Sequence, residues 1–114
     1  MIPNFIVKKL IINLSKFLFL SIIFLSIFIQ VKSDEKYDKG KTIFLEQGNC
    51  AACHTLLDAG SGGDIGPNLN EIRPDLMRVI VAVTNGIGVM PAYQGELSTE
   101  EIEAVAHYVS VSAE

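Results

Sequence analysis

Cysteine and histidine are scarce in this chain of 114 residues, which contains two of each. Cys50, Cys53, His54 and His107 do not match the ligand spacing of a zinc finger, so the sequence argues against a structural zinc site. The glycine-rich stretch 60–66 lacks the Gly-Lys-Ser/Thr ending of a phosphate-binding loop. These absences remove two common kinds of site, and the chemistry has to come from the few residues that remain.

Acidic residues are absent from the first 33 residues, which fall into three parts. Residues 1–16 carry three lysines, residues 17–31 carry no charge, and the small residue Ser33 follows. A basic start, a short apolar run and a small-residue end are typical of a secretory signal peptide. The uncharged run is also shorter than the roughly 20 residues of a permanent membrane-spanning helix. We predict a signal peptide at 1–33, cleaved after Ser33, with an uncleaved N-terminal anchor as the alternative, and one domain at 34–114.

Basic residues are few in the predicted domain. Residues 34–114 contain five basic side chains and all 13 acidic ones, which gives a formal charge of −8. We therefore expect no nucleic-acid partner, and we expect the acidic surface to steer the protein towards basic patches on partner proteins. The alternative is that the acidity only aids solubility. The domain has one phenylalanine and no tryptophan, and a domain this small often needs a cofactor to complete its core.

The motif at residues 50–54, Cys-Ala-Ala-Cys-His, is typical of a c-type haem attachment site. Two cysteines three residues apart on a helical turn can face the same way, and each thiol can bond one vinyl group of the porphyrin. His54 can then ligate the iron. We predict one haem c, attached covalently through Cys50 and Cys53. The alternative is a thioredoxin-like dithiol or a disulfide, because an exported cysteine pair ordinarily oxidises; the adjacent histidine and the lack of alternating strand patterns argue against it.

Helical patterns separated by glycine-rich loops predict an all-α fold. The first helix is expected over residues 35–47, with Gly48 as its stop. A short helical turn is expected to begin at Cys50. Another helix is expected from Pro74, at its first position, to Gly86, because apolar residues recur between them at helical spacing.

The last helix has the strongest sequence signals. Ser98 and Glu101 match a capping box, and Leu97 and Ile102 are spaced for a hydrophobic staple. The apolar stripe of this helix consists of Ile102, Val105, Ala106 and Val109. At about 100° per residue His107 points roughly 140° away from Ile102. We therefore expect His107 to be a surface residue and not an iron ligand.

A six-coordinate haem iron needs a second axial ligand, and residues 34–114 contain two methionines. Met77 lies within a predicted helix, where a flexible apolar side chain most often fills space. Met90 precedes Pro91, which biases its backbone away from the helix, and it lies 36 residues after His54. A loop of this kind can bring a thioether to the iron or can simply connect two elements. We choose Met90 as the second iron ligand.

Taken together, these features resemble a class I c-type cytochrome of the small single-haem bacterial group, similar to cytochromes c6 and c553. The resemblance spans roughly residues 36–110. It rests on residues 50–54, 66–69, 85–93, 97–98, 100–102 and 105–109. It implies a cytochrome c fold, with about four short helices around one covalently bound haem. In this family the first and last helices cross closely, which implies that Gly40 and Phe44 meet the surface of residues 105–109.

The resemblance also assigns roles around the haem. In the family a proline after the haem motif accepts, through its carbonyl, the proton on the second nitrogen of the ligating imidazole, and Pro67 matches it. The chain has no tryptophan to contact a haem propionate, as larger relatives do. Tyr93 and Asn68 are candidates for that contact, with packing as the alternative for the tyrosine. The lysine-rich rim of mitochondrial cytochrome c is also missing, so docking should differ.

These features predict a periplasmic carrier of single electrons with His/Met axial ligation. A thioether opposite a histidine favours ferrous iron, and filled axial positions keep substrates from the iron, so we do not expect an enzyme. The alternatives are a haem enzyme or gas-binding protein with a displaceable sixth ligand, and a haem-free thiol-disulfide protein. We expect redox proteins as donors and acceptors, a monomer, and membrane contact only through partners or an uncleaved leader.

Overall fold

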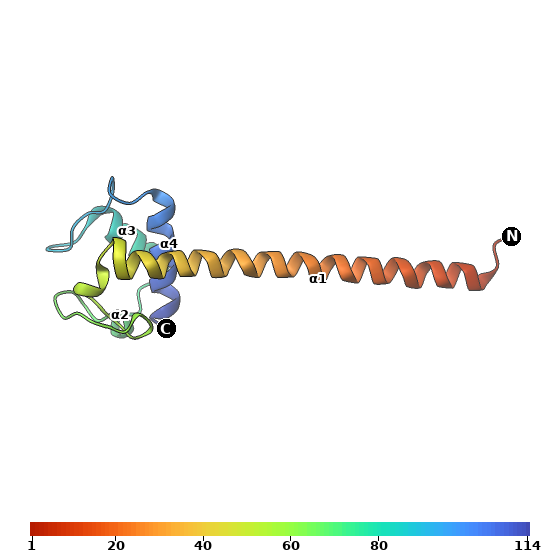
Figure 1. Ribbon diagram of the computed structural model, residues 1–114, viewed down its shortest axis with the longest axis horizontal. Coiled ribbons are helices and arrows are strands. Elements are labelled where there is room, and N and C mark those ends of the chain that lie inside the picture. The colour runs from red at the N-terminus through yellow and green to blue at the C-terminus, as the bar shows by residue number, and fades with distance from the viewer. The chain divides into compact units, whose positions relative to one another are not determined.

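The computed structural model describes the backbone of residues 1–114 and the side chains of residues 1–25 and 35–114. The chain forms two compact units, Met1–Ser33 and Asp34–Glu114. Helix α1, Asn4–Thr42, begins in the first unit and ends in the second (Figure 1). Among the described side chains, no helix carries an apolar stretch long enough to cross a membrane.

The first helix ends as predicted but starts much earlier. A π-helical turn, η1 (Ile43–Gln47), follows α1, and Gly48 closes it as its C-cap. The predicted start at residue 35 is wrong, because α1 already begins at Asn4. No glycine or proline lies between Pro3 and Gly40, so no residue in that interval breaks the helix.

The second unit is mainly helical and contains one small sheet. Its further elements are the 3-10 turns η2 (Cys50–Ala52) and η3 (Leu57–Ala59), the strands β1 (Thr55–Leu56) and β2 (Ser61–Gly62), and the helices α2 (Leu69–Ile72), α3 (Leu76–Asn85) and α4 (Thr99–Ser112). The strands are antiparallel, with Thr55 opposite Gly62 and Leu56 opposite Ser61. Two-residue strands are too short to show an alternating pattern, so the sequence did not indicate them.

Side-chain caps define the start of α2 and α3. The Asn68 side chain accepts a hydrogen bond from the Asn70 amide at 3.0 Å and begins α2, a four-residue helix that we did not predict. The Asp75 side chain accepts from the Arg78 amide at 2.9 Å. Pro74 therefore lies just before the N-cap of α3, and its predicted place at the first helical position is wrong.

The C-terminal end of α3 and the start of α4 match the prediction. Gly86, with φ of 71°, ends α3 in a backbone conformation that glycine adopts without strain. At α4 the Glu101 amide donates to Ser98 Oγ at 3.2 Å, and the Ser98 amide donates to Glu101 Oε2 at 2.8 Å. This reciprocal pair is the predicted capping box. The flanking Leu97 and Ile102 are both buried.

The end of α1 crosses α4 at close range. A Cβ atom placed on Gly40 would lie 2.7 Å from Cβ of Tyr108 and closer still to the backbone carbonyl of Ala104. The rings of Phe44 and Tyr108 meet edge to face, with centroids 5.7 Å apart. The crossing implied by the family resemblance is therefore present, and Gly40 is the residue that permits it.

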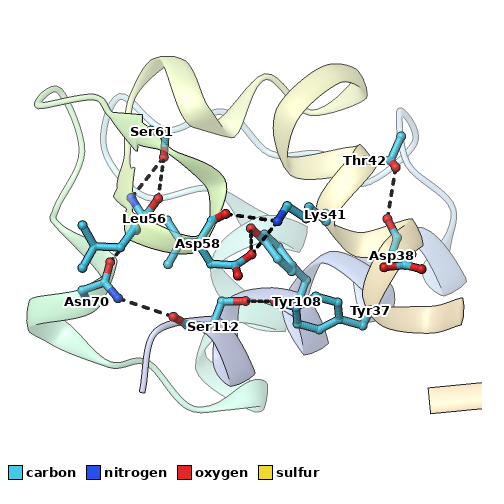
Figure 2. Close-up of polar contacts among 11 residues, drawn as sticks. Tyr37, Asp38, Lys41, Thr42, Leu56, Asp58, Ser61, Asn70, Tyr108 and Ser112 are labelled. Atoms are coloured by element: carbon cyan, nitrogen blue, oxygen red, sulfur yellow. Dashed lines mark hydrogen bonds and ion pairs between the residues drawn. The ribbon is translucent and has the colours of Figure 1, made fainter. Parts of the chain in front are cut away.

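A hydrogen-bonded cluster around Asp58, drawn in Figure 2, ties three separate segments together. Asp58 Oδ2 accepts a hydrogen bond from the Tyr108 hydroxyl of α4 at 2.8 Å, and Lys41 Nζ of α1 lies 2.9 Å from the same oxygen. Tyr37 and Ser112 share a hydrogen bond of 2.9 Å beside them. These contacts hold η3, which follows residues 50–54 and β1, against α1 and α4.

Candidate haem site

A cavity of about 450 Å³, which we call the central cavity, lies within the second unit. Its walls are mainly apolar and include Leu69, Val79, Val83, Val105 and Val109. A volume of this size is within the range of sites that hold small molecules and cofactors. The five residues that the sequence selected as a site all line it: Cys50, Cys53, His54, Pro67 and Met90.

The two cysteines lie on a tight turn. The amides of Cys53 and His54 both donate to the Cys50 carbonyl, at 3.1 and 2.9 Å. Asn49, with φ of 50°, begins this turn from a left-handed conformation. Burial raises the pKa of the Cys50 thiol to about 11. A redox-active dithiol requires a lowered cysteine pKa, so this environment argues against the thioredoxin-like alternative.

The His54 ring is held by a backbone carbonyl. Its Nδ1 lies 2.9 Å from the Pro67 carbonyl oxygen, and since a carbonyl can only accept, Nδ1 carries the proton. In the neutral ring Nε2 is then the nitrogen without a proton, which is the form that binds a metal. The backbone of the same residue is also held, because Ser61 Oγ donates to the His54 carbonyl at 2.9 Å.

Two glycines of the 60–66 stretch lie directly against the haem motif. A Cβ atom on Gly66 would lie 2.5 Å from Cε1 of the His54 ring, and one on Gly63 would lie 2.5 Å from the carbonyl carbon of Cys53. Neither distance is possible for a real side chain. We expected either flexibility or close approach from these glycines, and at these two positions the structure shows close approach to the motif.

Met90 lies in a tight loop after α3. Its amide and carbonyl both bond to Ile87, at 2.9 and 3.2 Å. The side chain is half-buried and packs against the hydrophobic core. Met77 behaves differently, because it is 62% exposed and does not line the central cavity. We had expected Met77 to fill space in the core, as a methionine in a helix most often does. That expectation is wrong.

The two candidates for a propionate contact both have other partners. The Tyr93 hydroxyl donates to the Gly48 carbonyl at 2.6 Å, which uses its only proton. Asn68 caps α2, donates to Glu71 at 3.2 Å and does not line the central cavity. His107 is half-buried and also lies outside the lining.

Asn49 and Arg78 are lining residues that the sequence analysis did not select. Arg78 lies four residues before Ala82, another lining residue, on the same face of α3. Neither residue belongs to the apolar pattern that predicted this helix, so the sequence held no signal for Arg78. Asn49 had none either, since its place in the wall depends on how the turn before Cys50 folds.

The donor groups fit a haem and do not fit a bare metal ion. In the part of the chain with described side chains, no three His, Cys, Asp or Glu residues cluster to hold a metal. The central cavity instead presents an imidazole nitrogen, a thioether and two thiols in an apolar wall. A porphyrin supplies four equatorial nitrogens of its own, so one or two axial ligands from the protein are sufficient.

Comparisons with known proteins agree with this geometry. Residues 35–109 match the family described as cytochrome C oxidase, cbb3-type, subunit III. Cytochrome c6 of Microcystis aeruginosa is 37% identical over 83 residues, covering 66% of this chain and 95% of the relative. Cytochrome c6 of Leptolyngbya boryana is 45% identical over 74 residues, covering 58% and 82%.

A solved structure supports the fold. The c-type cytochrome SorU of Sinorhizobium meliloti is 56% identical, with a TM-score of 0.67, covering 70% of this chain and 93% of SorU. The family model, the sequence relatives and the structural neighbour all point to the c-type cytochromes. The chain belongs to the small class I c-type cytochromes, which are electron carriers with a covalently bound haem c.

Proposed function

We propose that this cytochrome is a periplasmic carrier of one electron, with His54 and Met90 as the axial ligands of a single haem. The observation that carries the proposal is that both side chains line the central cavity together with Cys50 and Cys53. When bound, haem c would supply an iron atom that is reduced and reoxidised by one electron. The protein's own task is to hold that group, orient its ligands and keep water away.

Each residue has a separate part in this task. Cys50 and Cys53 provide the two covalent attachments. The Pro67 carbonyl fixes the proton of His54 on Nδ1 at 2.9 Å, which keeps Nε2 free and sets the ring orientation. The apolar walls exclude water, and a neutral thioether from Met90 adds no negative charge. Both effects favour ferrous iron and a high reduction potential.

The charge and the chain organisation support the proposed location and partners. The compact unit of residues 34–114 coincides with the domain that we predicted to follow a signal peptide at residues 1–33. That domain has a formal charge of −8. We propose that it is exported, acts as a monomer and docks through its acidic surface on basic patches of redox partners. A rise in ionic strength should therefore slow its association with them.

Replacing Met90 with histidine tests the proposed ligand set. Met90→His should keep the haem, because the cysteines are unchanged, and should lower the reduction potential by a sizeable part of the roughly 0.8 V over which axial ligands act. The weak near-infrared band of a bond between sulfur and ferric iron should disappear. A redox titration and an absorption spectrum of the ferric protein measure both effects.

Met77→His is the matched control, since Met77 is exposed and lies outside the central cavity. It should leave the potential and the near-infrared band unchanged. A Met90→His protein with the potential of the parent would show that Met90 is not a ligand. Immediate binding of carbon monoxide by the reduced parent protein would point instead to an open or easily displaced sixth position.

A further inference from the structure

Arg78 is the only lysine or arginine side chain in the described wall of the central cavity. The domain has five basic side chains, and its three lysines are paired with acids: Lys36 with Glu103 at 3.4 Å, Lys39 with Glu100 at 3.5 Å, and Lys41 with Asp58 at 2.9 Å. Arg73 donates from Nε to the Asn70 carbonyl at 3.3 Å. Within the described residues, the Arg78 guanidinium donates no hydrogen bond. The backbone amide of Arg78 donates to the Asp75 side chain.

The other polar groups of the wall are already committed. His54 uses Nδ1 for Pro67, and the proposed function uses Nε2 for iron. Tyr93 spends its hydroxyl proton on Gly48. The cysteines are the attachment points. Among the described lining side chains, only Asn49 and Arg78 keep unused hydrogen-bond donors, and of these only Arg78 carries a charge.

A haem brings two propionate carboxylates, and a carboxylate beside apolar walls needs donors or a cation to remain ionised at low cost. Arginine meets this need well, because its planar guanidinium can donate two parallel hydrogen bonds to one carboxylate. Arg78 precedes Val79, a buried wall residue, and is itself exposed. A long side chain in this position can cover the apolar wall with its stem while its charged end stays at the rim.

We propose that Arg78 binds a haem propionate, in place of the contacts first considered for Tyr93 and Asn68. This inference rests on the proposed function, since it requires the haem in the central cavity. The guanidinium would compensate one carboxylate charge near the iron. Less negative charge close to the iron favours the ferrous state, so Arg78 acts as a positioning residue for the cofactor and raises the reduction potential.

The test compares Arg78→Gln with Arg73→Gln in the haem-loaded protein. Both variants remove one positive charge, and the two arginines are five residues apart, but Arg73 does not line the central cavity. Arg78→Gln should lower the midpoint potential clearly more than Arg73→Gln, and the difference should persist in high salt, where distant charges are screened. Arg78→Lys should recover most of the midpoint potential, because it restores the positive charge. The recovery should be incomplete, because lysine cannot donate two parallel hydrogen bonds to one carboxylate.

Infrared difference spectra between the oxidised and reduced protein give a second readout. A propionate carboxylate band should shift in Arg78→Gln and stay in place in Arg73→Gln. Equal potentials for the two glutamine variants, or a carboxylate band that Arg78→Gln leaves unmoved, would overturn the inference. So would a larger shift in Asn49→Ala than in Arg78→Gln.

The proposed function fails separately from this inference. A parent protein without covalent haem, or without the near-infrared sulfur band, contradicts the proposed function itself. A parent with both signals, combined with an Arg78→Gln variant that matches Arg73→Gln, contradicts only the propionate contact. Arg78→Lys keeps the comparison informative if Arg78→Gln reduces the yield of folded protein, because it preserves the charge and most of the stem.

Discussion

The orientation of the His54 ring depends on small residues and backbone groups, and not on an acidic side chain. Pro67 supplies the carbonyl that accepts from Nδ1, and Gly66, the residue before it, lies so close to the ring that no side chain fits there. The Gly66 amide also donates to the Cys53 carbonyl at 2.8 Å. Motif and loop therefore brace each other through the backbone.

Gly66→Ala should displace the His54 ring while leaving the chemistry of the imidazole unchanged. The added methyl group would lie 2.5 Å from Cε1 of His54, so the ring or the loop has to move. We expect a cost of about 1–3 kcal/mol in the free energy of unfolding, together with a smaller yield of haem-loaded protein. Denaturant unfolding and the ratio of haem absorbance to protein measure these effects.

Gly62→Ala is the matched control, because a Cβ at Gly62 meets nothing within 4 Å. Its stability and haem content should equal those of the parent. If Gly66→Ala behaved like Gly62→Ala, the close approach of the loop to the imidazole would not matter for ligation.

Among the elements, the crossing of α1 and α4 depends on Gly40. The backbones approach so closely there that the carbonyl of Ala104 and the Cβ atom of Tyr108 occupy the space of a side chain. Interiors are packed too tightly to absorb an added methyl group without strain. Phe44, in the η1 turn that continues α1, and Val105 of α4 both line the central cavity, so the crossing also shapes the haem site.

Gly40→Ala should force the two helices apart. We expect a loss of about 1–3 kcal/mol in the free energy of unfolding, although alanine favours a helix over glycine by up to about 1 kcal/mol. Asp38→Ala, an exposed position on the same helix, is the control and should change stability little. A Gly40→Ala protein as stable as the parent would show that the helices can separate at no cost.

For the domain as a whole, the cluster around Asp58 links α1, η3 and α4. The hydrogen bond from Lys41 and then that from Tyr108 lower the pKa of Asp58. Burial, and then the bond to Asp58, raise the pKa of Tyr108. Both shifts favour a carboxylate that accepts from a neutral phenol at neutral pH. The cluster therefore holds the segment after the haem motif most firmly near neutrality.

The sign of the acid dependence follows from the lowered pKa of Asp58. The unfolded state binds a proton at higher pH than the native state does, so the stabilisation is present at neutral pH and is lost as the pH falls through the native pKa, below about pH 4. Asp58→Asn should lower the free energy of unfolding at pH 7 and make its fall towards low pH shallower. Denaturant titrations at several pH values measure this slope.

Asp64→Asn provides the comparison, because Asp64 is exposed in the neighbouring loop and makes no hydrogen bond among the described side chains. It should leave the acid slope nearly unchanged. An equal flattening by Asp58→Asn and Asp64→Asn would mean that general charge repulsion, and not the cluster, sets the acid stability.

Features that depend on neighbouring residues were correctly predicted. The capping box of Ser98 and Glu101, the stops at Gly48 and Gly86, and the turn that begins at Cys50 each depend on side chains and backbone within a few positions. Predictions that were wrong concern competition between local signals. The predicted helix start near residue 35 is wrong because residues 4–33 also contain no glycine or proline to break the helix. Pro74 is not the first residue of α3 because the Asp75 side chain caps that helix.

The site shows the same division. The sequence sufficed for the family and for the haem c that the family implies, because the Cys-x-x-Cys-His motif has a short, recognisable spacing. Attachment through Cys50 and Cys53, ligation by His54 and Met90, and the signal peptide stay predictions. Folding alone brought Arg78 into the cavity wall and Asp58 to Tyr108, and it placed Gly66 against the imidazole. These pairs are far apart in sequence or depend on helix orientation, and such contacts are set by how the segments pack and not by any local pattern.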